Sequence, residues 1–143
     1  CYFTIIINFG HFSSLICFES TFPDITREHV IEGVDFFVYL VNDGWYTSLI
    51  EPRQHARQSI YRAIENRISV IRCANTGISM VINPSGKMRY KTLLNTEDII
   101  TTFITKSNGI TFYTKYGNVF AYLVLIITGM FLLYSFYKNE KNN

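Results

Sequence analysis

The stretch Val34–Val41, VDFFVYLV, is an apolar run between Gly33 and the turn sequence Asn42-Asp43-Gly44. Such a run is typical of a strand that is covered on both faces. A proline at the start, acidic residues in the early turns and a glycine stop predict a helix over Pro23–Glu32. The largely apolar Phe12–Cys17 (FSSLIC) predicts a strand before that helix. Strand, helix and strand in this order are the signature of a βαβ unit.

The chain after this unit carries one more helix signal and several strand signals. Apolar residues at helical spacing, with arginines at the polar positions, predict a helix over Pro52–Arg67. Further strands are predicted over Val70–Ala74, Ile78–Ile82, Lys87–Thr92 and Ile99–Thr105. The turn sequence Asn83–Gly86 joins the second and third of these, and Tyr2–Phe9 predicts a strand at the N-terminus. The expected fold class is therefore α/β with a hairpin-rich second half.

The C-terminal segment Val119–Tyr137 (VFAYLVLIITGMFLLYSFY) contains no Asp, Glu, Lys, Arg or His. As a helix it would be roughly 28 Å long, which matches the hydrocarbon thickness of a bilayer. Tyrosines near both ends resemble interfacial aromatic belts. Lys138 and Lys141 favour a cytoplasmic tail, although Lys115 near the other end weakens this asymmetry. A buried helix of a soluble core is the alternative, but such helices usually keep a polar face.

Composition excludes several classes of protein. The 143 residues are 48% hydrophobic and only 17% charged, so intrinsic disorder is excluded and a membrane component is favoured. The net charge of +2 without runs of like charge argues against nucleic acid as a partner. Three scattered cysteines give neither a disulfide framework nor a pair with metal-ligand spacing, so no metal and no cofactor is expected.

Cys17 is the residue best placed for chemistry. It ends a predicted strand shortly before the N-terminus of a helix, where the dipole and free N–H groups activate a thiol and hold an oxyanion. A lone cysteine in an apolar strand is more often a small buried hydrophobe. Glu19 shifts the balance, because a carboxylate in this apolar and aromatic stretch must be paired or functional. The residues alone therefore favour a thiol enzyme on a membrane.

Three other features are candidates for binding or support. Trp45 follows a buried strand, at the end where open α/β sheets bind ligands, although core packing is an equally good explanation. His55 could be a base, but the sequence displays no His/Asp pairing, so a structural histidine is favoured. Arg62 and Glu65 are expected to form an ion pair.

At these positions the sequence resembles a known family. Leu15–Glu19 (LICFE) resembles the nucleophile strand of the carbon-nitrogen hydrolase, or nitrilase, superfamily, and within it the chain is most similar to bacterial apolipoprotein N-acyltransferases. The similarity covers nearly the whole chain from Leu15 onward. Further matching segments are Phe22-Pro23, Asn42–Tyr46, Pro52 with Gln54-His55, Arg62–Glu65, Arg72–Ser79, Asn83–Gly86 and Thr111–Gly117. Departures from the family pattern include Phe18 for Tyr, Gly44 and Thr47 for other small residues, and Phe112 for Pro.

The resemblance implies how the chain is organised and which of the family's catalytic residues it contains. Residues 1–106 would be the C-terminal part of a nitrilase-like αββα sandwich, 107–118 a linker, 119–137 a transmembrane helix and 138–143 a cytoplasmic tail. The family's catalytic set is Glu, Lys and Cys in that chain order, yet all six lysines of this sequence follow Cys17. The chain is therefore expected to be a C-terminal fragment that is inactive alone.

The resemblance also implies an activity. Cys17 would take an acyl group from a membrane phospholipid as a thioester and pass it to the diacylglyceryl-cysteine of an apolipoprotein. The backbone N–H of Phe18 would stabilise the oxyanion. Glu19 would orient the catalytic groups without contacting substrate itself, whereas Trp45, Asn42 and Asp43 would contact substrate. The expected location is a bacterial inner membrane, with the catalytic domain on the periplasmic side. An amidase acting on a small amide and a non-catalytic nitrilase-like scaffold are the alternatives.

Overall fold

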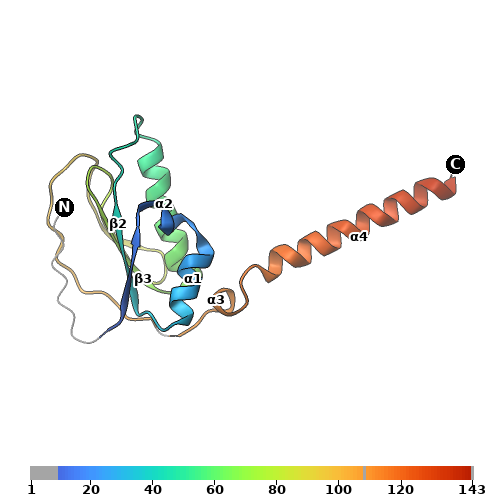
Figure 1. The fold of residues 1–143 in the computed structure, drawn as a ribbon, viewed down its shortest axis with the longest axis horizontal. Coiled ribbons are helices and arrows are strands. Elements are labelled where there is room, and N and C mark those ends of the chain that lie inside the picture. Colours follow the sequence, from blue (N-terminus) through green and yellow to red (C-terminus); the bar gives the residue numbers. More distant parts are fainter. Residues whose placement is uncertain (1–9, 108, 143) are drawn as a thin grey trace.

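The computed structural model describes residues 10–107 and 109–142, which form an α/β fold followed by one long helix (Figure 1). The first half consists, in chain order, of β1 (Phe12–Ile16), the 3-10 helix η1 (Cys17–Thr21), α1 (Pro23–Ile31), β2 (Phe36–Val41), α2 (Glu51–Asn66) and β3 (Ser69–Ala74). The predicted strands and helices of this half are confirmed, with β2 starting two residues later than expected. The strand predicted over Tyr2–Phe9 lies outside the described residues.

The five strands of the described chain form one mixed sheet in the order β1-β2-β3-β4-β5. β1, β2 and β3 are parallel, whereas β4 (Met80–Ile82) and β5 (Met88–Lys91) are joined to the sheet in antiparallel fashion. The predicted hairpin across Asn83–Gly86 is confirmed. Because parallel strands end at the same edge, the residues that follow β1 and β2 lie next to each other, and this edge is where open α/β sheets bind ligands.

α1 and α2 pack on one face of the sheet and enclose the main core (Figure 1). Pro23 begins α1 with Asp24 in its first turn, and α2 likewise has a proline and an acidic residue in its first turn. The largest apolar side chains in this core are almost completely buried: Phe37, Tyr39, Ile68, Val70, Met80 and Ile82. Each such side chain stabilises the fold by roughly 1.5–3 kcal/mol relative to an exposed position.

The opposite face of the sheet carries a smaller apolar cluster of Phe36, Val38 and Ile71, against which Ile104 packs. The strand predicted over Ile99–Thr105 is wrong. This segment crosses that face without regular strand structure, and only an isolated bridge occurs at Ile99. The weak alternation does not place its apolar residues in a core, because Ile99 and Phe103 are exposed and only Ile100 is buried.

Two helices follow the sheet. The short α3 (Phe112–Tyr116) interrupts the stretch 107–118 that was expected to be a linker, and it packs against α1 and α2. α4 (Val119–Asn142) extends away from the rest of the chain (Figure 1). The stretch Val119–Lys141 of α4 is long and apolar enough to cross a membrane. Its mean hydropathy is 2.2, and this apolar part of the helix is not buried against the rest of the described chain. The predicted C-terminal helix is therefore confirmed.

Candidate functional site

Cys17 lies at the carboxyl edge of the sheet, directly after β1 and at the first position of η1. Its φ of 51° is in the left-handed region, which non-glycine residues rarely adopt and which costs about 1–3 kcal/mol. The half-buried thiol donates a long hydrogen bond to the carbonyl oxygen of Asn42, with Sγ 3.6 Å from that oxygen. A reactive side chain held in a strained backbone turn is a recurring feature of functional sites.

The turn around Cys17 is stabilised by its own side chains. The Glu19 carboxylate accepts a hydrogen bond from the backbone N–H of Ile16 at 2.7 Å, and the Ser20 hydroxyl donates one to the carbonyl oxygen of Cys17 at 2.8 Å. The expectation that Glu19 sits in an apolar environment is wrong, because its side chain is exposed to solvent. Glu19 is nevertheless paired, since it caps the start of η1 and fixes the backbone before Cys17.

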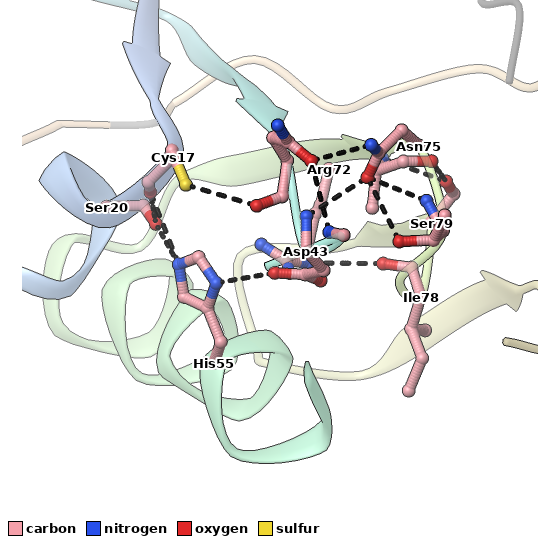
Figure 2. A network of polar contacts seen from close by, with 12 residues as sticks. Cys17, Ser20, Asp43, His55, Arg72, Asn75, Ile78 and Ser79 are labelled. Atoms are coloured by element: carbon pink, nitrogen blue, oxygen red, sulfur yellow. Dashed lines mark hydrogen bonds and ion pairs between the residues drawn. The ribbon is translucent and has the colours of Figure 1, made fainter. Parts of the chain in front are cut away.

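His55 connects the Cys17 turn to Asp43 on the loop after β2 (Figure 2). It projects from α2, with its Nδ1 atom 2.9 Å from Asp43 Oδ1 and its Nε2 atom 3.2 Å from the carbonyl oxygen of Cys17. The Ser20 hydroxyl lies 3.4 Å from the same Nε2 atom. The imidazole is 3% exposed, so it supports the Cys17 backbone from inside the protein.

Asp43 forms the buried centre of this network (Figure 2). Its second carboxylate oxygen accepts a hydrogen bond from Arg72 Nη2 at 2.6 Å, and both side chains are completely buried. Arg72 also donates from Nε to the carbonyl oxygen of Ile78 at 3.1 Å. Burial lowers the pKa of the Arg72 guanidinium, and the adjacent Asp43 carboxylate opposes this shift. The sequence predicts that Asp43 contacts substrate; in the structure its carboxylate is completely buried, and Arg72 and His55 each bind one of its two oxygens.

Asn42 and Trp45 lie on the loop after β2. The Asn42 side chain is held by Asn75, whose Nδ2 donates to Asn42 Oδ1 at 2.6 Å. The backbone carbonyl of Asn42 faces the Cys17 thiol. Trp45 is 80% exposed, so it is a loop residue rather than a core residue. A pocket of about 130 Å³ beside it is lined by residues of this loop, including Tyr46, Ser48 and Leu49, but not by Trp45.

Several other side chains bear on the chemistry near Cys17. Arg62 and Glu65 form the predicted ion pair at 2.7 Å. Cys73 lies in β3, and burial raises the pKa of its thiol. Among residues 10–107 and 109–142, no cluster of three or more His, Cys, Asp or Glu side chains has the geometry of a metal site. Within the same residues, no carboxylate, lysine or imidazole is hydrogen-bonded to the Cys17 thiol, whose one bond is to a backbone carbonyl.

The sequence analysis missed the network of Asp43, His55 and Arg72. These residues come from the loop after β2, from α2 and from β3, so no local spacing links them. The available signal was the presence of Asp43 directly after a buried strand, together with Arg72 inside the apolar stretch Ser69–Ala74. A charged residue inside a buried strand needs an opposite charge nearby.

Replacing Gly77 with alanine is expected to destabilise the fold by about 3 kcal/mol, at the upper end of overpacking effects. A Cβ atom at this position would overlap the carboxylate of Asp43, which Arg72 and His55 prevent from moving. Gly129→Ala is the control, because apart from the neighbouring backbone of α4 no described atom lies within 4 Å of its added Cβ. Denaturant unfolding of both variants checks the prediction, and an unchanged midpoint for Gly77→Ala would contradict the rigidity of this network.

Comparison with known proteins adds family information to this geometry. The family model for carbon-nitrogen hydrolase matches residues 4–110. The chain is 37% identical over 113 residues to the apolipoprotein N-acyltransferase of Geobacter metallireducens, covering 79% of this chain and 22% of that protein. It is 38% identical over 120 residues to the apolipoprotein N-acyltransferase of Rickettsia bellii, covering 83% of this chain and 23% of that protein. The chain thus spans less than a quarter of the length of these curated relatives.

A solved structure with the same fold is the carbon-nitrogen hydrolase from Helicobacter pylori G27. The two share 17% sequence identity and a TM-score of 0.52, over 68% of this chain and 41% of that chain. At this identity the likeness concerns the fold alone. It agrees with the mixed sheet and the two helices that place Cys17 at the carboxyl edge.

Proposed function

This chain belongs to the carbon-nitrogen hydrolase family, and on that premise we propose that it is part of an enzyme that N-acylates lipoproteins. The enzyme transfers a fatty acyl group from a membrane phospholipid, through a thioester on Cys17, to the α-amine of the diacylglyceryl-cysteine at the N-terminus of an apolipoprotein. The proposed units are residues 1–106 for the hydrolase-type domain, 107–118 for the connection, 119–137 for the membrane span and 138–143 for the cytoplasmic tail.

The observation that carries the proposal is the combination of a strained cysteine turn and an apolar helix in one chain. Cys17 adopts a φ of 51° at the carboxyl edge of the sheet, and α4 is long and apolar enough to cross a bilayer. A hydrolase of small soluble amides has no use for a membrane span beside its catalytic domain. The similarity to proteins named apolipoprotein N-acyltransferase extends over about four fifths of the chain and supports the same choice.

The proposed chemistry has two steps, each centred on the carbonyl carbon of the acyl group. In the first, a base takes the proton of the Cys17 thiol, the thiolate forms a C–S bond to this carbon, the ester C–O bond breaks, and the base gives the proton to the oxygen of the leaving lysophospholipid. In the second, the acceptor amine forms a C–N bond, the C–S bond breaks, and the base carries the amine proton to the leaving sulfur, which regenerates the thiol. Covalent catalysis of this kind divides one difficult transfer into two easier ones.

Each side chain of the site receives a role in this scheme. Cys17 is the nucleophile, and the backbone N–H of Phe18 donates to the oxyanion, because N–H groups in the first turn of a helix have no partner within it. Glu19 binds the backbone N–H of Ile16 and His55 lies against the carbonyl oxygen of Cys17, so both residues position the turn. The general base and a second oxyanion donor are the Glu and Lys of the family, which have no counterpart before Cys17 in these 143 residues.

Apolar side chains around the site fit a lipid substrate. Phe18 and Phe22 form an edge-to-face pair on the Cys17 turn and are 58% and 50% exposed. On the neighbouring loop, Trp45, Leu49 and Ile50 are also exposed. Exposed apolar side chains mark a binding surface where they gather into one patch, whereas single ones are normal on a protein surface. We propose that they contact the acyl chain, with Trp45 as part of the substrate-binding loop.

The function is tested by acyl transfer with the full-length protein in lipid vesicles. Phospholipid with a labelled acyl chain and a diacylated lipopeptide with a free α-amine are supplied together, and the triacylated product is measured by mass spectrometry. We expect product only when donor, acceptor and protein are all present. Hydrolysis of small amides without transfer would instead assign the protein as an amidase, and the absence of both reactions would assign it as a non-catalytic scaffold.

The 143 residues alone are expected to produce no triacylated lipopeptide, even when folded in detergent. Loss of one oxyanion donor typically reduces the rate about a hundred- to a thousandfold, and the general base is absent as well. Co-expression with an upstream portion that carries the Glu and the Lys, supplied from a separate gene, is expected to restore transfer. Turnover by the lone chain would mean that a group within it, such as His55, acts as the base.

A topology experiment tests the proposed location in a bacterial inner membrane, with the catalytic domain on the periplasmic side. A protease or thiol probe restricted to the outside is expected to reach an introduced site at Thr47, next to Trp45, and to spare a site at Asn143. Lys138 and Lys141 beyond the span agree with a cytoplasmic tail under the positive-inside rule. The reverse labelling pattern would contradict both the orientation and the lipoprotein substrate.

A further inference from the structure

The short helix α3 is tied to the domain by buried polar contacts. The Thr111 hydroxyl donates to the carbonyl oxygen of Glu65 at 2.6 Å, and the Thr114 hydroxyl donates to Asn66 Oδ1 at 2.8 Å. Arg27 on α1 donates from Nη1 to the carbonyl oxygen of Thr114 at 3.2 Å. Thr114 and Asn66 are completely buried. α3 is therefore held at both the end of α2 and the side of α1.

The same end of α2 is joined to the Cys17 turn. Asn66 donates from Nδ2 to the carbonyl oxygen of Arg62 at 3.2 Å, and Arg62 donates from Nη1 to the carbonyl oxygen of Thr21 at 2.9 Å. Thr21 closes η1, the 3-10 helix that begins at Cys17. Arg62 is 5% exposed and is fixed in place by its ion pair with Glu65. A continuous series of buried and partly buried hydrogen bonds thus runs from Thr114 to the turn that carries the thiol.

On its other side, α3 is close to the start of the apolar helix. α3 ends at Tyr116 and α4 begins at Val119, so only Gly117 and Asn118 lie between them. The three Cα–Cα steps from Tyr116 to Val119 reach at most about 11 Å. The position of α3 therefore limits where the first residues of α4 can lie relative to the domain.

The exposed face of α3 has the composition of a membrane interface. Phe112 is 71% exposed and Tyr116 is 51% exposed, and their rings contact each other with centroids 4.7 Å apart. The Lys115 ammonium lies over the Tyr116 ring, 5.2 Å from its centroid. Aromatic rings beside a lysine are typical of the headgroup layer at the end of a membrane span. One face of α3 thus contacts the protein, and the other presents groups suited to a lipid surface.

We propose that Thr111 and Thr114 form a clamp that sets the distance of Cys17 from the membrane surface. The clamp joins α3, which lies at the surface, to the helix and turn that position the thiol. Thr111 and Thr114 are positioning residues, because they act on the reaction only through the placement of Cys17. This inference rests on the proposed function, in which the acyl ester is part of a bilayer and so lies at a fixed depth.

The first experiment lengthens the connection without touching the clamp. In the full-length protein in vesicles, a Gly-Ser insertion between Gly117 and Asn118 is expected to reduce acyl transfer from bilayer phospholipid by about tenfold or more, since small misplacements of reacting groups have effects of this size. Transfer from a short-chain phospholipid dissolved in water, and alkylation of Cys17 by iodoacetamide, are expected to stay within about twofold of wild type. Unchanged transfer from bilayer phospholipid would overturn the proposal.

The second experiment breaks the clamp itself. Thr114→Val removes the hydroxyl that binds Asn66, whereas Thr114→Ser keeps it. We expect the valine variant to lose bilayer-donor transfer selectively and the serine variant to retain it. Thr102→Val is the matched control, because among the described residues that hydroxyl bonds only to the neighbouring carbonyl oxygen of Phe103. If Thr114→Val lowered iodoacetamide alkylation as much as transfer, or left transfer unchanged, the clamp would have no positioning role.

A distance measurement that does not depend on activity tests the clamp separately from the proposed function. A fluorophore at Glu28, which is exposed on α1, reports distance by energy transfer to acceptor-labelled lipid headgroups. The Gly-Ser insertion and Thr114→Val are expected to lower the transfer efficiency, and Thr114→Ser is not. If the wild-type protein transferred no acyl group from either donor, the proposed function would fail, but these efficiencies would still decide the clamp. Equal efficiencies in all variants would refute it.

Discussion

Replacing Cys17 with alanine in the full-length protein is expected to abolish both the acyl adduct and lipopeptide acylation. Removing a covalent nucleophile from a preorganised site typically reduces kcat by on the order of 10⁴- to 10⁶-fold. The effect follows from the position of Cys17, which is the cysteine at the carboxyl edge of the sheet and in the left-handed turn. Intact-mass spectrometry after incubation with phospholipid should show one acyl adduct in the wild-type protein and none in the variant.

Two further variants sharpen this result. Cys17→Ser is also expected to be inactive, because the much higher pKa of a hydroxyl leaves it poorly activated by groups suited to a thiol. Cys73→Ala is the matched control and should keep the adduct, since burial in β3 raises the pKa of the Cys73 thiol and disfavours its reactive form. If the acyl adduct still formed in Cys17→Ala, Cys17 would not be the nucleophile.

Replacing Arg72 with methionine is expected to lower the free energy of unfolding by roughly 3–5 kcal/mol, the usual cost of leaving one partner of a buried ion pair uncompensated. The Asp43 carboxylate would then remain buried without contact to water. Of its two side-chain partners, Arg72 and His55, only His55 would be left. Unfolding of the chain by denaturant in detergent, followed by circular dichroism, measures the loss.

The matched control for this loss is an ion pair at the surface. Lys106→Met removes the partner of Asp35 in a pair that is 3.9 Å long and has a half-exposed lysine, so the expected change is below about 1 kcal/mol. Loss of Arg72 should also loosen the Cys17 turn, because Asp43 holds His55 and His55 lies against the Cys17 carbonyl. If both variants unfolded at the same denaturant concentration, the buried pair would not be a determinant of the fold.

The strands and helices with strong local patterns could be predicted from the sequence. The apolar run of β2 and the periodic pattern of α2 are properties of consecutive residues, and both elements occur within a few residues of the expected bounds. The segment Ile99–Thr105 was predicted wrongly because alternation over so few residues does not reveal which surface is free to pair. Its route across the second face depends on the apolar cluster of Phe36, Val38 and Ile71.

The position of Cys17 at a strand end was also predictable, since a short strand followed by a helix signal fixes it. The wrong expectation about Glu19 has a local cause as well. Its neighbours Phe18 and Phe22 are apolar in sequence but exposed in the fold, so the carboxylate is not buried. Apolar composition predicts burial only where another element covers the segment.

The sequence by itself determined the α/β class, the strand-to-turn position of Cys17 and the apolar C-terminal helix, because each follows from the pattern of consecutive side chains. Only the tertiary structure decided how Cys17 is held. Asp43 lies 12 positions before His55 and 29 positions before Arg72, and the three meet because β2 and β3 are parallel neighbours and α2 packs on β3. Contacts of this kind depend on strand order and helix packing, which short-range sequence patterns do not encode.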